Sequence, residues 1–279
     1  MQKEQLPVNF AAPLNLTLMM QPATLSLAFA AATDTGCKRA NNQDSFGYNT
    51  DPHLYVVCDG VGGALGGEVA SNTAVRNFIE SFDAQSEAAQ QPELPIESKL
   101  LYSIEQANRA VRDVSTSDPR FSNMGTTLVC ACIDGTRAVI GNVGDSRAYL
   151  IRDGVCVQIT HDHSLIAEQL QNGLLTQEMA EKSSLQSVIT RAIGMAETVE
   201  PDLFAATLQA EDMLLLASDG LTRYLKPTEI ASIASADLEL QVICKRFVEC
   251  AKQRGGADNI TCIVLRATSW VADPSPVTS

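Results

Sequence analysis

Two apolar runs in this chain each end on an Asp-Gly pair: LYVVCDG at 54–60 and LLLASDG at 214–220. Short apolar runs bounded by turn residues predict buried strands. A carboxylate at the end of a buried strand is costly unless it is paired, hydrogen-bonded or bound to a cation. Asp59 and Asp219 therefore each need a partner, and this need constrains the fold more than any other feature of the sequence.

Two further aspartates stand in a similar context. Asp145 lies in GNVGDSR between two predicted strands, and Asp258 directly precedes the apolar run NITCIVL. The chain has too few nearby basic residues to pair with all four, which favours a metal. Oxygen ligands without clustered His or Cys indicate Mg²⁺ or Mn²⁺. An alternative stays open at this point, because Asp-Gly is also a common turn dipeptide.

Composition limits the class of protein. The 279 residues are 45% hydrophobic with a mean hydropathy near zero, which is enough for a packed core and too polar for an integral membrane protein. A formal charge of −13 argues against nucleic-acid binding. The eight cysteines form no C-x-x-C pair, so buried free thiols are expected. We expect a cytoplasmic protein that does not bind membranes.

Hydrophobic spacing predicts the main elements. The predicted helices lie at 69–82, 97–114, 227–233 and 237–253, with two short helices around Gly173. The predicted strands include 24–32, 54–60, 212–220 and 259–269, and hairpins are predicted at the Asp-Gly pairs 134–135 and 153–154. Residues 83–96 are expected to form a surface loop. Hairpins interleaved with helix pairs favour a layered α+β fold.

A series of short motifs runs through the chain in order. They are GCKRANNQD (36–44), DGVGG (59–63) followed by GGEVAS, MGTTL (124–128), GDSR (144–147), THDHS (160–164), TRAIG (190–194), SDG (218–220) and DNIT (258–261). Together they resemble the metal-dependent 2C-type Ser/Thr protein phosphatases, the PPM family, in their bacterial form. The resemblance spans about 25 to 267, and eight motifs in register make it specific.

The resemblance implies a four-layer α-β-β-α sandwich of two antiparallel sheets flanked by helices. One domain at 23–269 would carry a flap at about 165–190, between a tail at 1–22 and another at 270–279. Asp59 would bridge two Mn²⁺ or Mg²⁺ ions, and the carbonyl of Gly60 would add a ligand. Asp219 and Asp258 would complete the second site, and Asp145 would bind a third, weaker ion. For Asp145, a structural turn bonded to Ser146 or Arg147 remains the alternative.

The resemblance also implies an activity. A water activated by the metals would hydrolyse phosphoserine and phosphothreonine in proteins, with Asp44 holding water in the outer shell and Arg39 binding the phosphoryl group. A planar guanidinium suits that group. The partners would be phosphorylated proteins and a cognate Ser/Thr kinase, and the enzyme would be a monomer.

Three positions depart from the family pattern. Ala64 stands where bacterial members often have His, Gln43 replaces an acid, and Val61 replaces a common Met. Ala64 and Gln43 motivate an alternative, a catalytically weak regulatory protein that keeps the fold and binds a partner. Every ligand aspartate is present, so activity is expected. A metal-dependent phosphodiesterase or nuclease is a third possibility, which the acidic composition disfavours.

Overall fold

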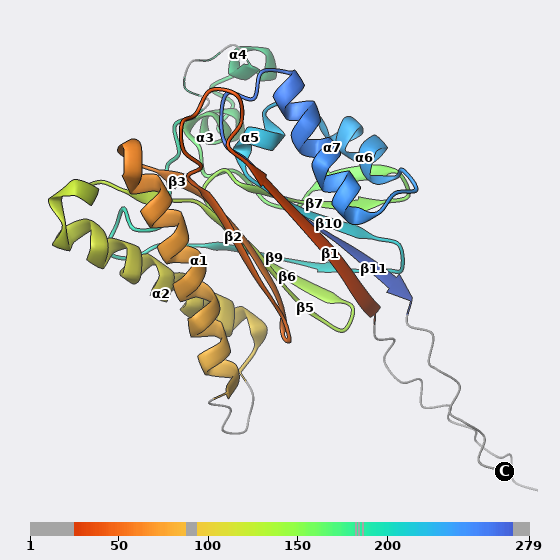
Figure 1. The fold of residues 1–279 in the computed structure, drawn as a ribbon, viewed down its shortest axis with the longest axis horizontal. Helices are drawn as coiled ribbons and strands as arrows, with labels where there is room; N and C mark the ends of the chain where they lie inside the picture. Colours follow the sequence, from red (N-terminus) through yellow and green to blue (C-terminus); the bar gives the residue numbers. More distant parts are fainter. Residues whose placement is uncertain (1–24, 88–93, 182, 184, 186, 270–279) are drawn as a thin grey trace, which may run out of the picture.

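The computed structural model describes residues 25–87, 94–181, 183, 185 and 187–269. Two antiparallel sheets stack face to face, with helices on both outer faces (Figure 1). The first, the β10 sheet, has the order β1 (Leu25–Asp34), β11 (Ile260–Ser269), β10 (Met213–Ala217), β7 (Arg147–Arg152) and β8 (Val155–Gln158). The second, the β3 sheet, has the order β2 (Asp44–Thr50), β3 (His53–Val61), β5 (Leu128–Asp134), β6 (Arg137–Val143) and β9 (Asp202–Thr207), and β4 (Gly125–Thr126) pairs with β3.

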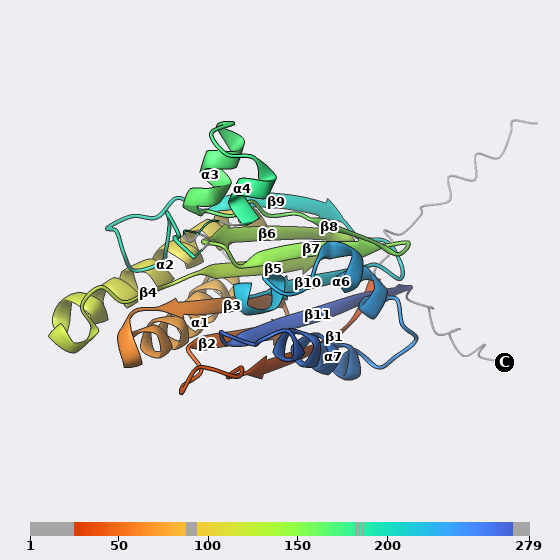
Figure 2. The same ribbon diagram turned by 90° about the horizontal axis from the view of Figure 1, so that it is seen from above.

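Helix pairs form the outer layers. The β3 sheet is covered by α1 (Gly63–Glu87) and α2 (Ile96–Ser117), and the β10 sheet by α6 (Pro227–Ala234) and α7 (Leu240–Gln253) (Figure 1). The remaining helices are η1 (Pro119–Phe121), α3 (Leu165–Gln171), α4 (Gln177–Glu181) and α5 (Asp219–Thr222). Of these, α3 and α4 project away from the two sheets (Figure 2). The predicted four-layer α-β-β-α sandwich is confirmed.

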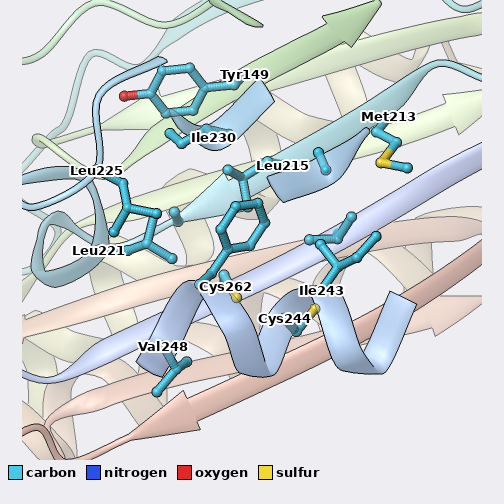
Figure 3. Packing of buried hydrophobic residues seen from close by; sticks show 14 of the residues in the cluster. Tyr149, Met213, Leu215, Leu221, Leu225, Ile230, Ile243, Cys244, Val248 and Cys262 are labelled. Atoms are coloured by element: carbon cyan, nitrogen blue, oxygen red, sulfur yellow. The ribbon is translucent and has the colours of Figure 1, made fainter. Parts of the chain in front are cut away.

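Side-chain alternation explains why both sheets are buried on two faces. On β3, Tyr55 and Val57 pack between the sheets, whereas Leu54 and Val56 pack under α1 and α2. The strands of the β10 sheet alternate in the same way, so that one set of side chains packs between the sheets and the other under α6 and α7. Figure 3 shows the second set, with Cys244 of α7 lying close to Cys262 of β11.

Several predicted boundaries are wrong. The helix predicted at 69–82 begins at Gly63 and ends at Glu87, so the predicted surface loop is helical over 83–87, and 88–93 lie outside the described residues. Gly is a poor helix former, and here tertiary packing outweighs propensity. The strand predicted to reach Gly220 ends at Ala217, and Asp219 instead begins α5. The edge strands β2 and β9 have no counterpart in the prediction.

Other local predictions are confirmed. Asp153 and Gly154 both have positive φ, 50° and 74°, as a two-residue turn between β7 and β8 requires. Two short helices, α3 and α4, flank Gly173. All eight cysteines are free thiols. Among the helices that the structure describes, none combines the length and apolar character needed to cross a membrane. Both predicted tails lie outside the described residues.

Candidate active site

Asp44 and Asp59 lie opposite each other on neighbouring strands. They are register partners on β2 and β3. Asp59 follows the alternation of Tyr55 and Val57, whose side chains pack between the sheets, and partners in register share a face. Both carboxylates therefore continue the inter-sheet layer at its end. At this end of the inter-sheet layer the side chains are acidic instead of apolar.

The β10 sheet contributes hydroxyl groups to this layer. The Ser218 hydroxyl, one residue after β10, donates to Asp44 Oδ2 over 2.8 Å. Its oxygen accepts from the backbone N–H of Thr261 on β11 over 3.0 Å. Asp44 on one sheet is thus tied to two strand ends of the other, and this contact fixes the relative position of the carboxylates from the two sheets.

A cavity of about 520 Å³ opens at this end of the sandwich. Six of the predicted site residues line it: Arg39, Asp59, Gly60, Asp145, Asp219 and Asp258. Asp44 is buried beside it and is 7% exposed. The structure therefore brings together residues that are separated by more than two hundred positions in the sequence.

Crowding of carboxylates shifts their pKa values. Burial, with the nearby charges of Asp219 and Asp258, raises the pKa of Asp44 to about 7 despite hydrogen bonds from Ser218 and Thr261. Burial also raises the pKa of Asp145 to about 7, with Asp219 and Asp162 adding to the shift. The pKa of Asp59 lies well above its usual value because of burial and the neighbouring carboxylates. Such a cluster is stabilised by bound cations.

Arg39 lies at the rim of the cavity on the loop between β1 and β2. Its Nη2 donates to Asp258 Oδ2 over 2.9 Å, and its side chain is 51% exposed. Asn259 holds this loop: its amide donates to the carbonyls of Thr35 and Asn41, both over 2.9 Å, and its Oδ1 accepts from Gln43 N–H over 2.8 Å. The arginine is placed by its loop and remains open to solvent.

A second arginine at the site escaped the sequence prediction. Arg223 pairs with Asp219 Oδ2, four residues before it, and lines the cavity. The i, i+4 spacing of opposite charges was the available signal, but Asp219 was predicted in a strand, where this spacing has no such meaning. Two of the four strand-end aspartates thus have an arginine partner, Asp258 and Asp219.

The alternative for Asp145, a turn bonded to its neighbours, receives no support from their contacts. The Ser146 hydroxyl bonds the Thr127 hydroxyl over 2.7 Å, and Arg147 donates to Asp162 over 2.6 and 2.9 Å. His163 Nδ1 accepts from the N–H of Gly144 over 3.2 Å.

The backbone around Asp59 is closely packed. Its N–H donates to the Thr127 hydroxyl and its carbonyl accepts from the Thr126 hydroxyl, both over 2.9 Å. A Cβ on Gly60 would lie 2.1 Å from the carbonyl oxygen of Gly67, so only glycine fits there. Ala64, where the family often has His, is the second residue of α1.

The donor set suits hard divalent cations. Four aspartate carboxylates line the cavity, and Asp44 Oδ1 and Asp219 Oδ1 are buried without a hydrogen-bond partner in the structure. Across the described ranges, no three His, Cys, Asp or Glu side chains lie close enough together to hold one ion between them. Mg²⁺-like ions usually keep several waters and take one or two carboxylates, so an ion shared by Asp59, Asp219 and Asp258 would require these three carboxylates to come closer together.

Comparison with known proteins agrees with the sequence motifs. The family described as Protein phosphatase 2C matches residues 28–260. The serine/threonine phosphatase stp of Listeria monocytogenes serotype 4b (strain F2365) is 37% identical over 236 residues, which cover 84% of this chain and 93% of that protein.

Solved structures give the same result. A serine/threonine phosphatase of S. agalactiae superposes with a TM-score of 0.79 at 33% identity, covering 86% of this chain and 99% of the other. The catalytic domain of the serine/threonine protein phosphatase PstP, in complex with two manganese ions, gives a TM-score of 0.76 at 32% identity, covering 88% and 100%.

The fold and the acidic cavity thus define a phosphatase of the α-β-β-α sandwich class. The chain belongs to the protein phosphatase 2C family, since the family match spans most of its length. The resemblance inferred from the motifs is confirmed.

Proposed function

We propose that this protein hydrolyses phosphoserine and phosphothreonine in proteins with the help of Mn²⁺ or Mg²⁺, and so reverses the action of a Ser/Thr kinase. Family membership makes the chain a protein-serine/threonine phosphatase. The observation that carries the metal requirement is the group of aspartates from two sheets at one cavity. In this group the pKa values of Asp44, Asp59, Asp145 and Asp219 are raised, and one buried oxygen each of Asp44 and Asp219 has no hydrogen-bond partner.

The family resemblance implies a role for each aspartate, and the position of each in the structure is compatible with that role. Asp59, which lies among the other carboxylates, would bridge two ions, with the Gly60 carbonyl beside it. Asp219 and Asp258, at the ends of β10 and β11, would bind one of these ions, and Asp145 a third. A structural neighbour that binds two manganese ions supports the count of two. Asp44 is buried behind the cavity and would orient water.

Divalent cations supply such a site with a water of lowered pKa and offset charge on the phosphoryl oxygens. The chain itself would position the substrate. Arg39 is exposed at the rim, and its fork would bind two phosphoryl oxygens in place of its single contact with Asp258. The Thr126 and Thr127 contacts would keep Asp59 fixed during turnover, so that no reorganisation is needed at the reacting phosphorus.

The alternative of a weak regulatory binding protein is not favoured, because every proposed ligand is in place and the relatives are named as phosphatases. The cytoplasmic location, the monomeric state and the expectation that neither nucleic acid nor membrane is bound stay predictions.

The function is tested with p-nitrophenyl phosphate, a phosphothreonine peptide and a phosphodiester analogue. We expect hydrolysis of both monoesters with Mn²⁺, loss of turnover in EDTA, and little reaction with the diester. Absence of monoester hydrolysis under all metal conditions would refute the proposal, and faster diester cleavage would favour the nuclease alternative. Dephosphorylation of an autophosphorylated bacterial Ser/Thr kinase tests the link to kinase signalling.

A further inference from the structure

A second, smaller cavity adjoins the catalytic one. It has a volume of about 240 Å³ and shares Asp145, Asp219 and Arg223 with the larger cavity. We name it the flap-side cavity, because α3 and α4 form one wall. Its other lining residues are Arg147, Asp162, Ser164, Ile166, Ala167, Leu170, Ala180 and Thr222.

The charges in the flap-side cavity are arranged unevenly. Arg147 is engaged by Asp162, with contacts of 2.6 and 2.9 Å, and by the Tyr149 hydroxyl at 3.2 Å. The charges of Arg147 and Asp162 therefore neutralise each other within the flap-side cavity. Arg223 lies at the boundary between the two cavities, and its partner is Asp219, one of the proposed metal ligands.

The pairing of Arg223 therefore depends on what Asp219 binds. When Asp219 binds a cation, through Oδ1 or through both oxygens, its negative charge is shared with that cation and neutralises the guanidinium less completely. The side chain of Arg223 is only 35% exposed, and a partly buried cation with a weakened counter-charge is unfavourable. It then favours an anion from outside the chain, and a carboxylate matches its fork in geometry and charge.

The flap wall indicates the size and character of that anion. Ile166, Ala167 and Leu170 of α3 present apolar surface, which suits the methylene groups of an acidic side chain. The volume accepts one side chain of this kind and excludes a folded segment.

We propose that the flap-side cavity is a subsite for an acidic side chain that flanks the phosphorylated residue of the substrate, and that Arg223 binds it. The proposal rests on the proposed phosphatase function and adds a substrate class to it, namely acidic phosphopeptides. Arg39 would hold the phosphoryl group and Arg223 the flanking carboxylate, at different parts of one continuous opening.

The first test measures metal binding without catalysis. Mn²⁺ is titrated calorimetrically into metal-free wild type, Arg223→Met and Arg120→Met. Arg120 pairs with Asp118 and its side chain is 79% exposed, so it is a matched loss of charge at another site. We expect Arg223→Met to bind Mn²⁺ several-fold more tightly, because the competing cation is gone, and Arg120→Met to match wild type. Equal affinities in all three would overturn the exchange of Asp219 between Arg223 and the metal.

The second test measures substrate preference as a ratio within each enzyme. Phosphothreonine peptides carry Glu or the isosteric Gln at each flanking position in turn, and the ratio of their kcat/KM values cancels any effect of a variant on the metal centre. We expect wild type to prefer one Glu peptide by about tenfold, mainly through KM, as one charge-assisted pair would give. Arg223→Met should reduce the ratio to near one, Arg223→Lys should keep part of it, and Arg120→Met should keep all of it.

Three outcomes overturn the subsite: a wild-type Glu-to-Gln ratio near one at every position, a ratio below one at every position, or a ratio that survives in Arg223→Met. The wild-type ratio alone decides the matter if Arg223→Met fails to fold. Failure of the proposed function looks different, because then none of the enzymes hydrolyses p-nitrophenyl phosphate or any peptide.

Discussion

Arg39 and Arg223 pair with aspartates of the same cavity but are placed by different means. Arg39 lies on a loop that is held by hydrogen bonds to Asn259, more than two hundred residues away in sequence, and its side chain is 51% exposed. Arg223 sits one helical turn from its own partner and is 35% exposed. A residue held by distant contacts depends on the whole fold, whereas one held by local geometry needs only its helix. The comparison teaches that similar ion pairs at one site can differ in what supports them.

The largest expected effect comes from Asp59, which lines the same cavity as the two arginines. Asp59→Asn removes the proposed bridging charge, and we expect kcat/KM for p-nitrophenyl phosphate to fall at least about a thousandfold, since metal-based charge stabilisation is worth several kcal/mol. The loss of kcat/KM in this variant is the reference with which the losses in the arginine variants are compared. Circular dichroism and thermal unfolding check that the variant is folded. A folded variant with near wild-type turnover would contradict the assignment.

Neither arginine forms an ion pair with Asp44 in the structure, so this residue shows what an unpaired carboxylate costs. Its folded pKa, raised to about 7, exceeds the unfolded value of about 3.9. Protonation of Asp44 therefore stabilises the folded state. This stabilisation is present in full below about pH 4 and is lost as the pH rises through 7. We therefore expect metal-free wild type to lose up to a few kcal/mol relative to Asp44→Asn between pH 4 and 8, measured by urea unfolding. A pH-independent difference would contradict the raised pKa.

Mn²⁺ should reverse this loss. Because ligands must be deprotonated to bind metal, the rise in unfolding temperature of wild type on adding Mn²⁺ is expected to be larger at pH 8 than at pH 5. An equal rise at both values would argue against carboxylate ligands.

Removal of Arg39 is expected to have the next largest effect on activity. Arg39→Met loses a charge-assisted contact to the phosphoryl group, which corresponds to about tenfold to a hundredfold in kcat/KM. The loss should appear with p-nitrophenyl phosphate and with every peptide, whereas the Glu-to-Gln ratio should stay unchanged. Arg109→Met, which removes an exposed arginine paired with Glu105, serves as the control. A change in the Glu-to-Gln ratio of Arg39→Met would indicate that Arg39 and Arg223 both act on the flanking carboxylate.

Asn259→Ala tests the difference in support directly and should have the smallest effect of these variants. Loss of its three hydrogen bonds frees the Arg39 loop, and we expect KM for small phosphoesters to rise by several-fold, up to about tenfold. The Glu-to-Gln ratio, which depends on Arg223, should be retained. Asn72→Ala, whose amide bonds only its own helix at Glu68, is the control. If Asn259→Ala raises KM for small phosphoesters and also reduces the Glu-to-Gln ratio, Arg39 and Arg223 are not held independently of each other.

The ends of buried strands were more predictable from the sequence than the elements that come after them. The motifs located Asp59 and Asp258, and the uninterrupted apolar run LYVVC predicted a buried strand. The motif around Arg39 likewise identified that residue without its tertiary contacts. Arg223 was not predictable in the same way, because its role depends on a change from strand to helix after Ala217 that the apolar run conceals.

The edge strands β2 and β9 were not predicted from the sequence, for a different physical reason. The residues of β2, DSFGYNT, are partly exposed and show weak alternation, although the register of this strand with β3 is what sets Asp44 against Asp59. Pairing across strands is a long-range property, and local periodicity does not contain it.

The hydroxyl of Ser218 joins the two sheets at the end that carries the cavity. Ions that bind aspartates of both sheets would cross the same boundary, so metal binding would resist the sliding of one sheet over the other. Slow amide hydrogen exchange in β3 and β10 would then become slower still in the metal-loaded protein, even at positions far from the cavity. A packing defect between the sheets would in turn weaken metal affinity without altering a single ligand.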